Sequence, residues 1–113
     1  MENKVDIAEY IEQTCMEIIA NAGEGRAHVF EALEHVLKED YESAKAALDE
    51  GEQFLQQAHS AQFTKLMAYQ LNGNEVPFSI IILHAMDLLM VSTSERDLLK
   101  CIVNARLSGG TEQ

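Results

Sequence analysis

Apolar residues recur at spacings of three and four along almost the whole chain, and this repeat limits the fold more than any other feature of the sequence. Such spacing places side chains on one face of an α-helix, whereas a β-strand alternates every second residue. The chain contains one proline, Pro77, and no sustained alternation of β-branched residues. The sequence therefore predicts an all-α fold.

The repeat falls into three segments, and we expect helices at about residues 5–38, 41–70 and 79–107. The connections between them are short, which favours antiparallel neighbours. A chain of 113 residues with 47% hydrophobic content can bury one compact core but not two ordinary ones. The sequence thus predicts a single domain over residues 1–113, a three-helix up-down-up bundle with a polar tail at 108–113.

Polar residues mark the ends of the second and third helices. Asp40 is the expected N-cap of the second helix, where its carboxylate can accept hydrogen bonds from the N–H groups of Glu42 and Ser43. Ser79 is the expected N-cap of the third helix. Residues 72–74, Asn-Gly-Asn, interrupt the repeat between the two helices.

Two apolar stripes are expected to pack the first helix against the second. They consist of Ile7, Ile11, Cys15, Ile18, Ala22, Val29, Leu33 and Val36 in the first helix, and of Ala44, Leu48, Gly51, Leu55 and Ala58 in the second. Gly23 and Gly25 each cost about 1 kcal/mol relative to alanine inside a helix. We therefore expect either a kink at these glycines or a close contact with the helix backbone.

The first half of the third segment is apolar around almost its whole circumference. Its apolar residues are Ile80, Ile81, Ile82, Leu83, Met86, Leu88, Leu89, Met90 and Val91. Two other helices cannot cover all of that surface, and a helix that is apolar all round is normally buried on every side. Packing the same helix from other subunits into a shared core is the simplest way to cover it, so we expect an oligomer.

The charge balance disfavours some classes of partner. The chain carries 19 acidic and 8 basic side chains, a formal net charge of -11, which works against binding to nucleic acid or anionic lipid. Cys15 and Cys101 stand in no metal-binding spacing, and we expect reduced thiols. The amino terminus lacks the apolar stretch of a secretory signal, and Asp87 interrupts the apolar run at 76–91. We expect a cytoplasmic protein.

His84 and Asp87 are the strongest candidates for chemistry. They lie three residues apart and project from one helix face, where a carboxylate can orient an imidazole and leave its other nitrogen free as a nucleophile. The same spacing also fits a hydrogen-bonded pair at a helix interface, and spacing alone does not decide between the two. The sequence has no P-loop, dinucleotide fingerprint or nucleophile elbow.

A metal centre is a rival hypothesis. His28, His35 and His59 fall in other segments, so neither a three-ligand zinc site nor a di-iron bundle motif is complete. Asp87 contributes to a metal site only if symmetry brings several copies together, because clustered buried carboxylates must be neutralised by a cation or by protons.

The remaining candidates are interpreted as structural residues. His59 and Gln62, one turn apart, are expected at the surface or at an interface. The side chains expected in the core are Met16, Met67, Met86 and Met90, together with Phe54, Phe63 and Phe78.

Four segments of the chain resemble one known family. The most specific is residues 79–90, SIIILHAMDLLM, which is similar to the family pattern S-L-L-L-V-H-A-Q-D-H-L-M. Supporting segments are residues 18–33, which resemble the family's A-G-x-A-R-S and E-A-L, residues 40–44, and residues 58–62, AHSAQ, which resemble A-H-x-x-Q. In this order and spacing they resemble the lactose/cellobiose class of IIA proteins of the bacterial sugar phosphotransferase system, over about residues 7–107.

The resemblance implies a fold, a reaction and its residues. The family forms a three-helix up-down-up protomer that assembles as a homotrimer. His84 corresponds to the histidine that accepts a phosphoryl group from the phosphocarrier protein HPr and donates it to a cysteine of the IIB component, while the membrane IIC component admits the sugar. Asp87 corresponds to an aspartate of which three copies meet near the trimer axis and hold a divalent cation, commonly Mg²⁺.

Two residues beside His84 depart from the family pattern. Met86 stands in place of a glutamine and Leu88 in place of a second histidine. If those polar residues hold the phosphoryl group or tune His84, transfer is slower or partner choice is altered. The hypothesis is therefore a phosphocarrier for uptake of a lactose/cellobiose-type disaccharide, and the alternative is a regulatory or binding relative that keeps the trimeric scaffold without transfer.

Overall fold

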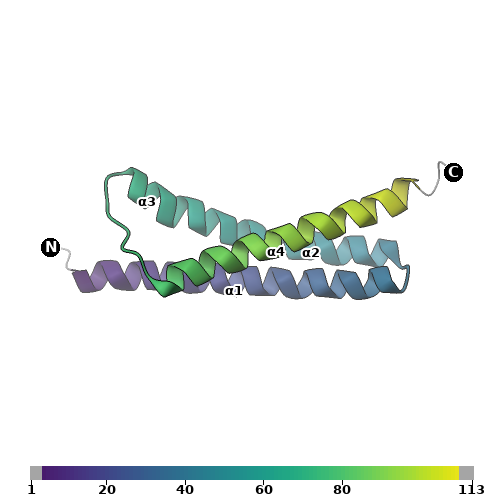
Figure 1. The fold of residues 1–113 in the computed structure, drawn as a ribbon, viewed down its shortest axis with the longest axis horizontal. Helices are drawn as coiled ribbons and strands as arrows, with labels where there is room; N and C mark the ends of the chain where they lie inside the picture. Colours follow the sequence, from purple (N-terminus) through teal and green to yellow (C-terminus); the bar gives the residue numbers. More distant parts are fainter. Residues whose placement is uncertain (1–3, 110–113) are drawn as a thin grey trace.

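The computed structural model describes residues 4–109, whose regular elements are all helical (Figure 1). They are α1 (Lys4–Leu37), α2 (Tyr41–Ala61), a π-helical segment (Gln62–Met67), α3 (Ala68–Leu71), α4 (Ile80–Asn104) and a second π-helical segment (Ala105–Gly109). Because α2, the first π-helical segment and α3 follow one another without a break, the chain forms three long helical rods. The predicted all-α, three-helix fold is confirmed.

The third rod differs most from expectation at its end. Residues Ala105–Gly109 continue the rod into the segment expected to be a polar tail, and residues 110–113 of that tail lie outside the described part of the chain. Within residues 4–109, none of the helices combines the length and the apolar character needed to cross a membrane. The interpretation of residues 1–113 as one domain stays a prediction.

The rods enclose two apolar clusters. α1 and α2 form an antiparallel hairpin, and α4 lies across both of them (Figure 1). One cluster contains Ile11, Cys15, Ile18, Ala22, Leu55, Ala58, Ala61, Leu66, Ala85 and Leu89, and the other contains Val29, Ala32, Ala44, Ala47, Leu48, Leu99 and Val103. Most of these residues belong to the two predicted stripes. With dimensions of 65 × 22 × 18 Å, the bundle is a thin rod with little depth to bury large side chains.

The two cysteines are unbonded, as expected. Cys15 is buried among the apolar side chains of the first cluster, whereas Cys101 is exposed on α4. Burial raises the pKa of the Cys15 thiol, because the thiolate loses its hydration there. Cys15 is therefore a packing residue with low reactivity.

Two glycines let α1 and α2 touch backbone to backbone. A Cβ atom on Gly25 would lie 2.8 Å from Cγ of Leu55 and 3.0 Å from the carbonyl oxygen of Gly51. A Cβ on Gly51 would lie 2.9 Å from the carbonyl oxygen of Gly25. No heavy atom lies within 4 Å of a Cβ built on Gly23. The sequence predicted either a kink or a close backbone contact at Gly23 and Gly25. The structure has the close contact, and it is made by Gly25.

Short polar side chains start the second and third rods. Oδ1 of Asp40 accepts a hydrogen bond from the Ser43 N–H at 3.2 Å, whereas the expected bond from Glu42 is absent from the capping contacts of this helix. Oγ of Ser79 accepts one from the Ile82 N–H at 3.3 Å. The Ser79 cap fixes the first turn of α4, which carries His84 one turn further on.

Substitution of the glycines tests the close contact. Gly51→Ala places a methyl group against a backbone oxygen, so we expect it to lower the free energy of unfolding by about 1–3 kcal/mol. Gly23→Ala meets open space and should raise the free energy of unfolding by about 0.5–1 kcal/mol through helix propensity alone. Urea unfolding followed by circular dichroism, at one fixed protein concentration, measures both. Equal effects of the two substitutions would contradict the contact.

Candidate functional site

The outward face of α4 is a stripe of exposed, mostly apolar side chains. We define this outer stripe as Ile80, Leu83, His84, Asp87, Met90, Val91, Ser94, Leu98, Cys101 and Ile102. The opposite side of α4 packs into the bundle through Ala85, Leu89, Ser92, Leu99 and Val103. Ile80 is 74% exposed, Met90 67% and Leu98 68%. Apolar surface of this extent marks an interaction site.

Both predicted site residues, His84 and Asp87, lie exposed in the outer stripe. They sit on neighbouring turns of α4, but among the interactions of residues 4–109 no hydrogen bond or ion pair joins them. The hydrogen-bonded pair that the spacing left open does not form in the single protomer. The imidazole of His84 is instead accessible to a partner.

One flank of the outer stripe borders α1, and we call it the α1 flank. Glu95 accepts hydrogen bonds from Nε of Arg26 at 2.8 Å and from Nη2 at 3.0 Å. Further along, Leu98 and Ile102 border a groove of about 270 Å³ with Val29 and other residues of α1. Eighteen residues make five turns of an α-helix, so His84 lies on the same line of α4 as Ile102 and belongs to this flank.

The other flank borders α2, and we call it the α2 flank. Its contacts recur every seven residues along α4: Met86 Sδ accepts a hydrogen bond from Gln62 Nε2 at 2.8 Å, Thr93 Oγ1 lies 3.0 Å from His59 Nε2, and Lys100 Nζ donates to Glu52 at 3.3 Å. His59 of α2 and Gln62 of the π-helical segment therefore hold the second rod against α4, and they are not brought to the His84 ring of their own protomer.

The two departures from the family pattern occupy packing positions. Met86 faces Gln62 across the α2 flank. Leu88 is partly buried against the cluster that contains Ile18 and Leu55. Met86 points to the other flank of α4, whereas Leu88 follows His84 by four residues and so places an apolar side chain next to the ring, where the family pattern has a histidine.

The π-helical segment Gln62–Met67 has no signal in the apolar repeat, and sequence reasoning missed it. α1 ties it down, because Tyr10 Oη donates to the Lys65 carbonyl oxygen at 3.1 Å and Lys65 Nζ donates to Glu17 at 2.8 Å. Phe63 is 60% exposed and Met67 43%, so their interpretation as core residues is wrong. Single π-helical turns occur frequently at functional sites.

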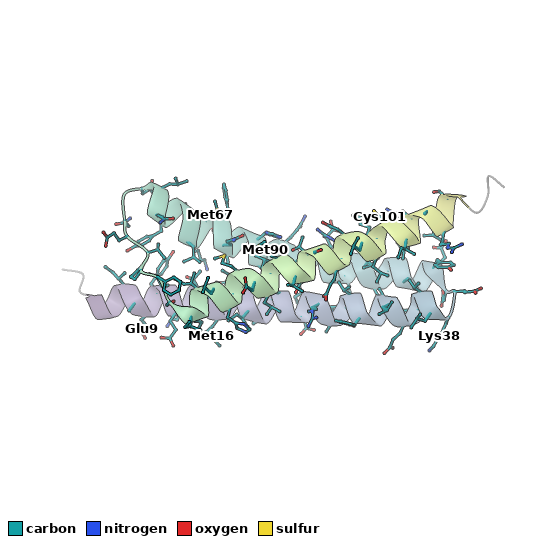
Figure 2. The ribbon with its side chains drawn as sticks, viewed as in Figure 1. Glu9, Met16, Lys38, Met67, Met90 and Cys101 are labelled. Carbon is teal, nitrogen blue, oxygen red and sulfur yellow. The ribbon has the colours of Figure 1, made fainter. Side chains whose placement is uncertain are left out.

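Three further predicted core residues are exposed. Met16 is 53% exposed and Phe78 78%, and Met90 lies in the outer stripe. Figure 2 shows Met16 on the α1 side of α4 and Met67 on the opposite side. A spacing of three and four could have identified Met67, which follows His59 and Phe63 at intervals of four on one face of the second rod.

No set of metal ligands is assembled within residues 4–109 of one chain. His28 lies among Glu24, Glu31 and Glu50, at 3.8, 3.2 and 3.7 Å, and stacks on Phe54, which makes it a polar contact between α1 and α2. Asp87 is exposed at the centre of the outer stripe with free carboxylate oxygens. These oxygens suit a hard divalent cation, but a single carboxylate supplies too few ligands without further copies.

Comparison with known proteins assigns the family. Residues 13–106 match the model of the PTS system lactose/cellobiose-specific IIA subunit, and the chain belongs to this family. The segment matched contains α2, most of α1 and all of α4, together with His84 and Asp87. The chain is thus a IIA component of a phosphotransferase system.

Individual relatives agree with this assignment. The PTS system lactose-specific EIIA component of Staphylococcus aureus (strain N315) is 34% identical over 92 residues, which cover 81% of this chain and 88% of the relative. The N,N'-diacetylchitobiose-specific EIIA component of Escherichia coli (strain K12) is also 34% identical over 92 residues, covering 81% of this chain and 78% of the relative. The crystal structure of PtcA from S. mutans has a TM-score of 0.81 at 31% identity, covering 92% of this chain and 96% of that one.

The Arg26–Glu95 pair gives the bundle a pH dependence that can be measured. The hydrogen bonds from Arg26 hold the pKa of Glu95 below its ordinary value of 4.5. A carboxylate with a lowered pKa stabilises the fold above its ordinary pKa, and this contribution is lost as the pH falls through the folded-state value.

We therefore expect Glu95→Gln to reduce the acid sensitivity of the bundle. Between about pH 6 and pH 3 the variant should lose less stability than the unmodified protein, because the amide does not titrate. Urea unfolding at a series of pH values measures the difference. Glu34→Gln, which alters an exposed glutamate without an ion pair among the described residues, is the control and should leave the pH profile unchanged.

Proposed function

We propose that this protein is a phosphocarrier that accepts a phosphoryl group on His84 from HPr and passes it to a cysteine of the IIB component. The observation that carries the proposal is the position of His84: it lies exposed on the outer stripe, within the segment most similar to the family pattern. The sugar class is a lactose/cellobiose-type disaccharide, which enters through the membrane IIC component while the carrier stays cytoplasmic. The names of the relatives support this class.

Phosphoryl transfer requires little of the protein beyond holding the His84 ring in position. A ring nitrogen of His84 attacks the phosphorus carried by HPr, and the P–N bond there breaks with its electron pair returning to the HPr imidazole. In the second transfer the IIB thiolate attacks, and the electron pair of the P–N bond returns to His84. Each step exchanges one bond to phosphorus for another, so an exposed imidazole on a rigid helix is sufficient provided that both partners can align with it.

We also propose that the protein works as a homotrimer assembled through the outer stripe. Three copies of an apolar α4 face would cover one another, which satisfies the expectation drawn from the sequence. Asp87 lies at the centre of that face, so the three carboxylates would be the group that holds a divalent cation, most simply Mg²⁺. The cation would supply charge neutralisation to the assembly.

Phosphorylation of His84 is the first test. Incubation with phosphoenolpyruvate, Enzyme I and HPr should add one phosphoryl group per chain, and His84→Ala should abolish it completely because no second acceptor is proposed. Intact-protein mass spectrometry measures both. A modification that persists in His84→Ala would disprove the assignment, and His59→Ala serves as a matched histidine control that should remain phosphorylated.

Onward transfer decides between the phosphocarrier and its alternative, the regulatory or binding relative without transfer. Met86 and Leu88 are the residues that motivate this alternative. Phosphorylated protein mixed with a cognate IIB component should lose its phosphoryl group to the IIB cysteine. Stable retention on His84 in the presence of IIB would favour the alternative.

Substitution of Asp87, whose three carboxylates would lie together in the proposed trimer, tests the assembly. We expect light scattering to report a trimer, and Asp87→Leu to retain it or to strengthen it in the absence of divalent cations, because three like charges are removed from an apolar contact. The unmodified trimer should weaken when a chelator removes the cation, whereas the variant should not respond. A monomer at micromolar concentration would contradict the proposed interface.

A further inference from the structure

We propose that Met86 is a redox-sensitive modification site, and that its oxidation to methionine sulfoxide by a peroxide tightens the contact between the π-helical segment and α4. A hydrogen bond from Gln62 to the Met86 sulfur and a groove beside this bond support the assignment. The change lies within one protomer, so it depends neither on the proposed phosphotransfer nor on the proposed trimer.

The Met86 sulfur has a hydrogen-bond donor beside it. Gln62 Nε2 lies 2.8 Å from the Sδ atom, and within residues 4–109 no other methionine sulfur accepts a hydrogen bond from a side chain. Thioether sulfur is a weak acceptor, so this part-buried amide N–H donates to a partner that stabilises the contact only slightly. An acceptor oxygen at the same place would make a stronger bond.

Oxidation supplies such an oxygen. The sulfur lone pair of Met86 attacks one oxygen of hydrogen peroxide, the O–O bond breaks, and the proton of the transferred hydroxyl passes to the leaving oxygen to give water. Sulfur loses two electrons and the peroxide gains them. The three rotatable bonds of the side chain let the sulfoxide oxygen turn towards the Gln62 amide. The product thereby resembles the glutamine that the family pattern has at this position.

The groove beside Met86 provides access and space. Met86 and Gln62 border this groove of about 320 Å³ together with Met67 and Phe78. Met86 is only partly buried, so a small oxidant reaches its sulfur through the groove in the folded protein. The added oxygen atom needs less room than a water molecule, whose share of liquid volume is about 30 Å³. The groove therefore admits a peroxide and accommodates the sulfoxide.

The expected effect on stability is opposite to the usual one. Oxidation of a methionine in apolar surroundings places an oxygen where no donor meets it, which lowers the free energy of unfolding. At Met86 the donor is already in place. Met16 and Met90 are 53% and 67% exposed, so water solvates their sulfoxides and the fold changes little in stability. Oxidation of Met86 should therefore stabilise the contact between the second rod and α4.

Urea unfolding of selectively oxidised protein tests this effect. The test protein carries Met16→Leu, Met67→Leu, Met90→Leu and Cys101→Ser, which leaves Met86 as the only methionine besides Met1 and removes the exposed thiol. Dilute hydrogen peroxide should add one oxygen atom to Met86, as peptide-mapping mass spectrometry will show, and should raise the urea midpoint by roughly 0.5 M. A lowered midpoint, or a Met86 that reacts only in unfolded protein, would overturn the proposal.

Gln62→Leu in the same test protein is the decisive control. Leucine keeps most of the side-chain volume but removes the amide donor, so the gain in midpoint on oxidation should disappear. An equal gain with and without Gln62 would show that the hydrogen bond is not the cause, and the proposal would fail. Met86→Leu in the test protein should not respond to peroxide, because the oxidised sulfur is then absent.

Reversal separates the modification from other damage. Methionine sulfoxide reductases of both stereospecificities, supplied with a thiol reductant, should remove the added oxygen and return the urea midpoint to its value before oxidation. A midpoint that stays raised after the mass of the Met86 peptide has returned would place the cause elsewhere in the chain and would overturn the proposal.

Discussion

The backbone contact between Gly25 and Gly51 is the constraint from which the rest of the bundle follows. It draws α1 and α2 together until a single added methyl group would collide with the facing chain. The residues that flank the crossing are mostly small, among them Ala22, Ala44 and Ala58, all fully buried. Because this hairpin is narrow, α1 and α2 can cover only one side of α4. The other side of α4, the outer stripe, therefore stays uncovered.

The uncovered side carries His84, the proposed phosphoryl acceptor. A phosphoryl carrier must expose its histidine to two different proteins, yet it must also delay attack by water during the interval between them. An apolar helix face meets both needs once copies of the chain associate, since most of the stripe is then buried and the flank that carries His84 stays at the edge. The proposed assembly and the proposed chemistry thus use the same surface of α4.

The fold was predictable from the sequence to a large extent, and the site only in part. The three-and-four repeat identified the buried stripes, and Ser79 was a correct N-cap because such caps depend on local hydrogen bonds alone. The same repeat cannot separate a core position from an apolar position that stays exposed in the protomer, which is why Phe63 and Met67 were assigned to the core. The π-helical turn follows from tertiary contacts with Tyr10 and Glu17, which no local pattern encodes. For His84, spacing left two interpretations open, and only the family pattern favoured one of them.

Met86, one of the two departures from the family pattern, affects the packing of α4 against the second rod. Methionine and glutamine have similar length and volume, so the exchange keeps the packing of the α2 flank and replaces one acceptor for the Gln62 amide by another, weaker one. Gln62 begins the π-helical segment, so its hydrogen bond to Met86 fixes the start of that segment against α4. A change at Met86 therefore acts on the packing of the second rod against α4, and it does so without touching the imidazole two residues away.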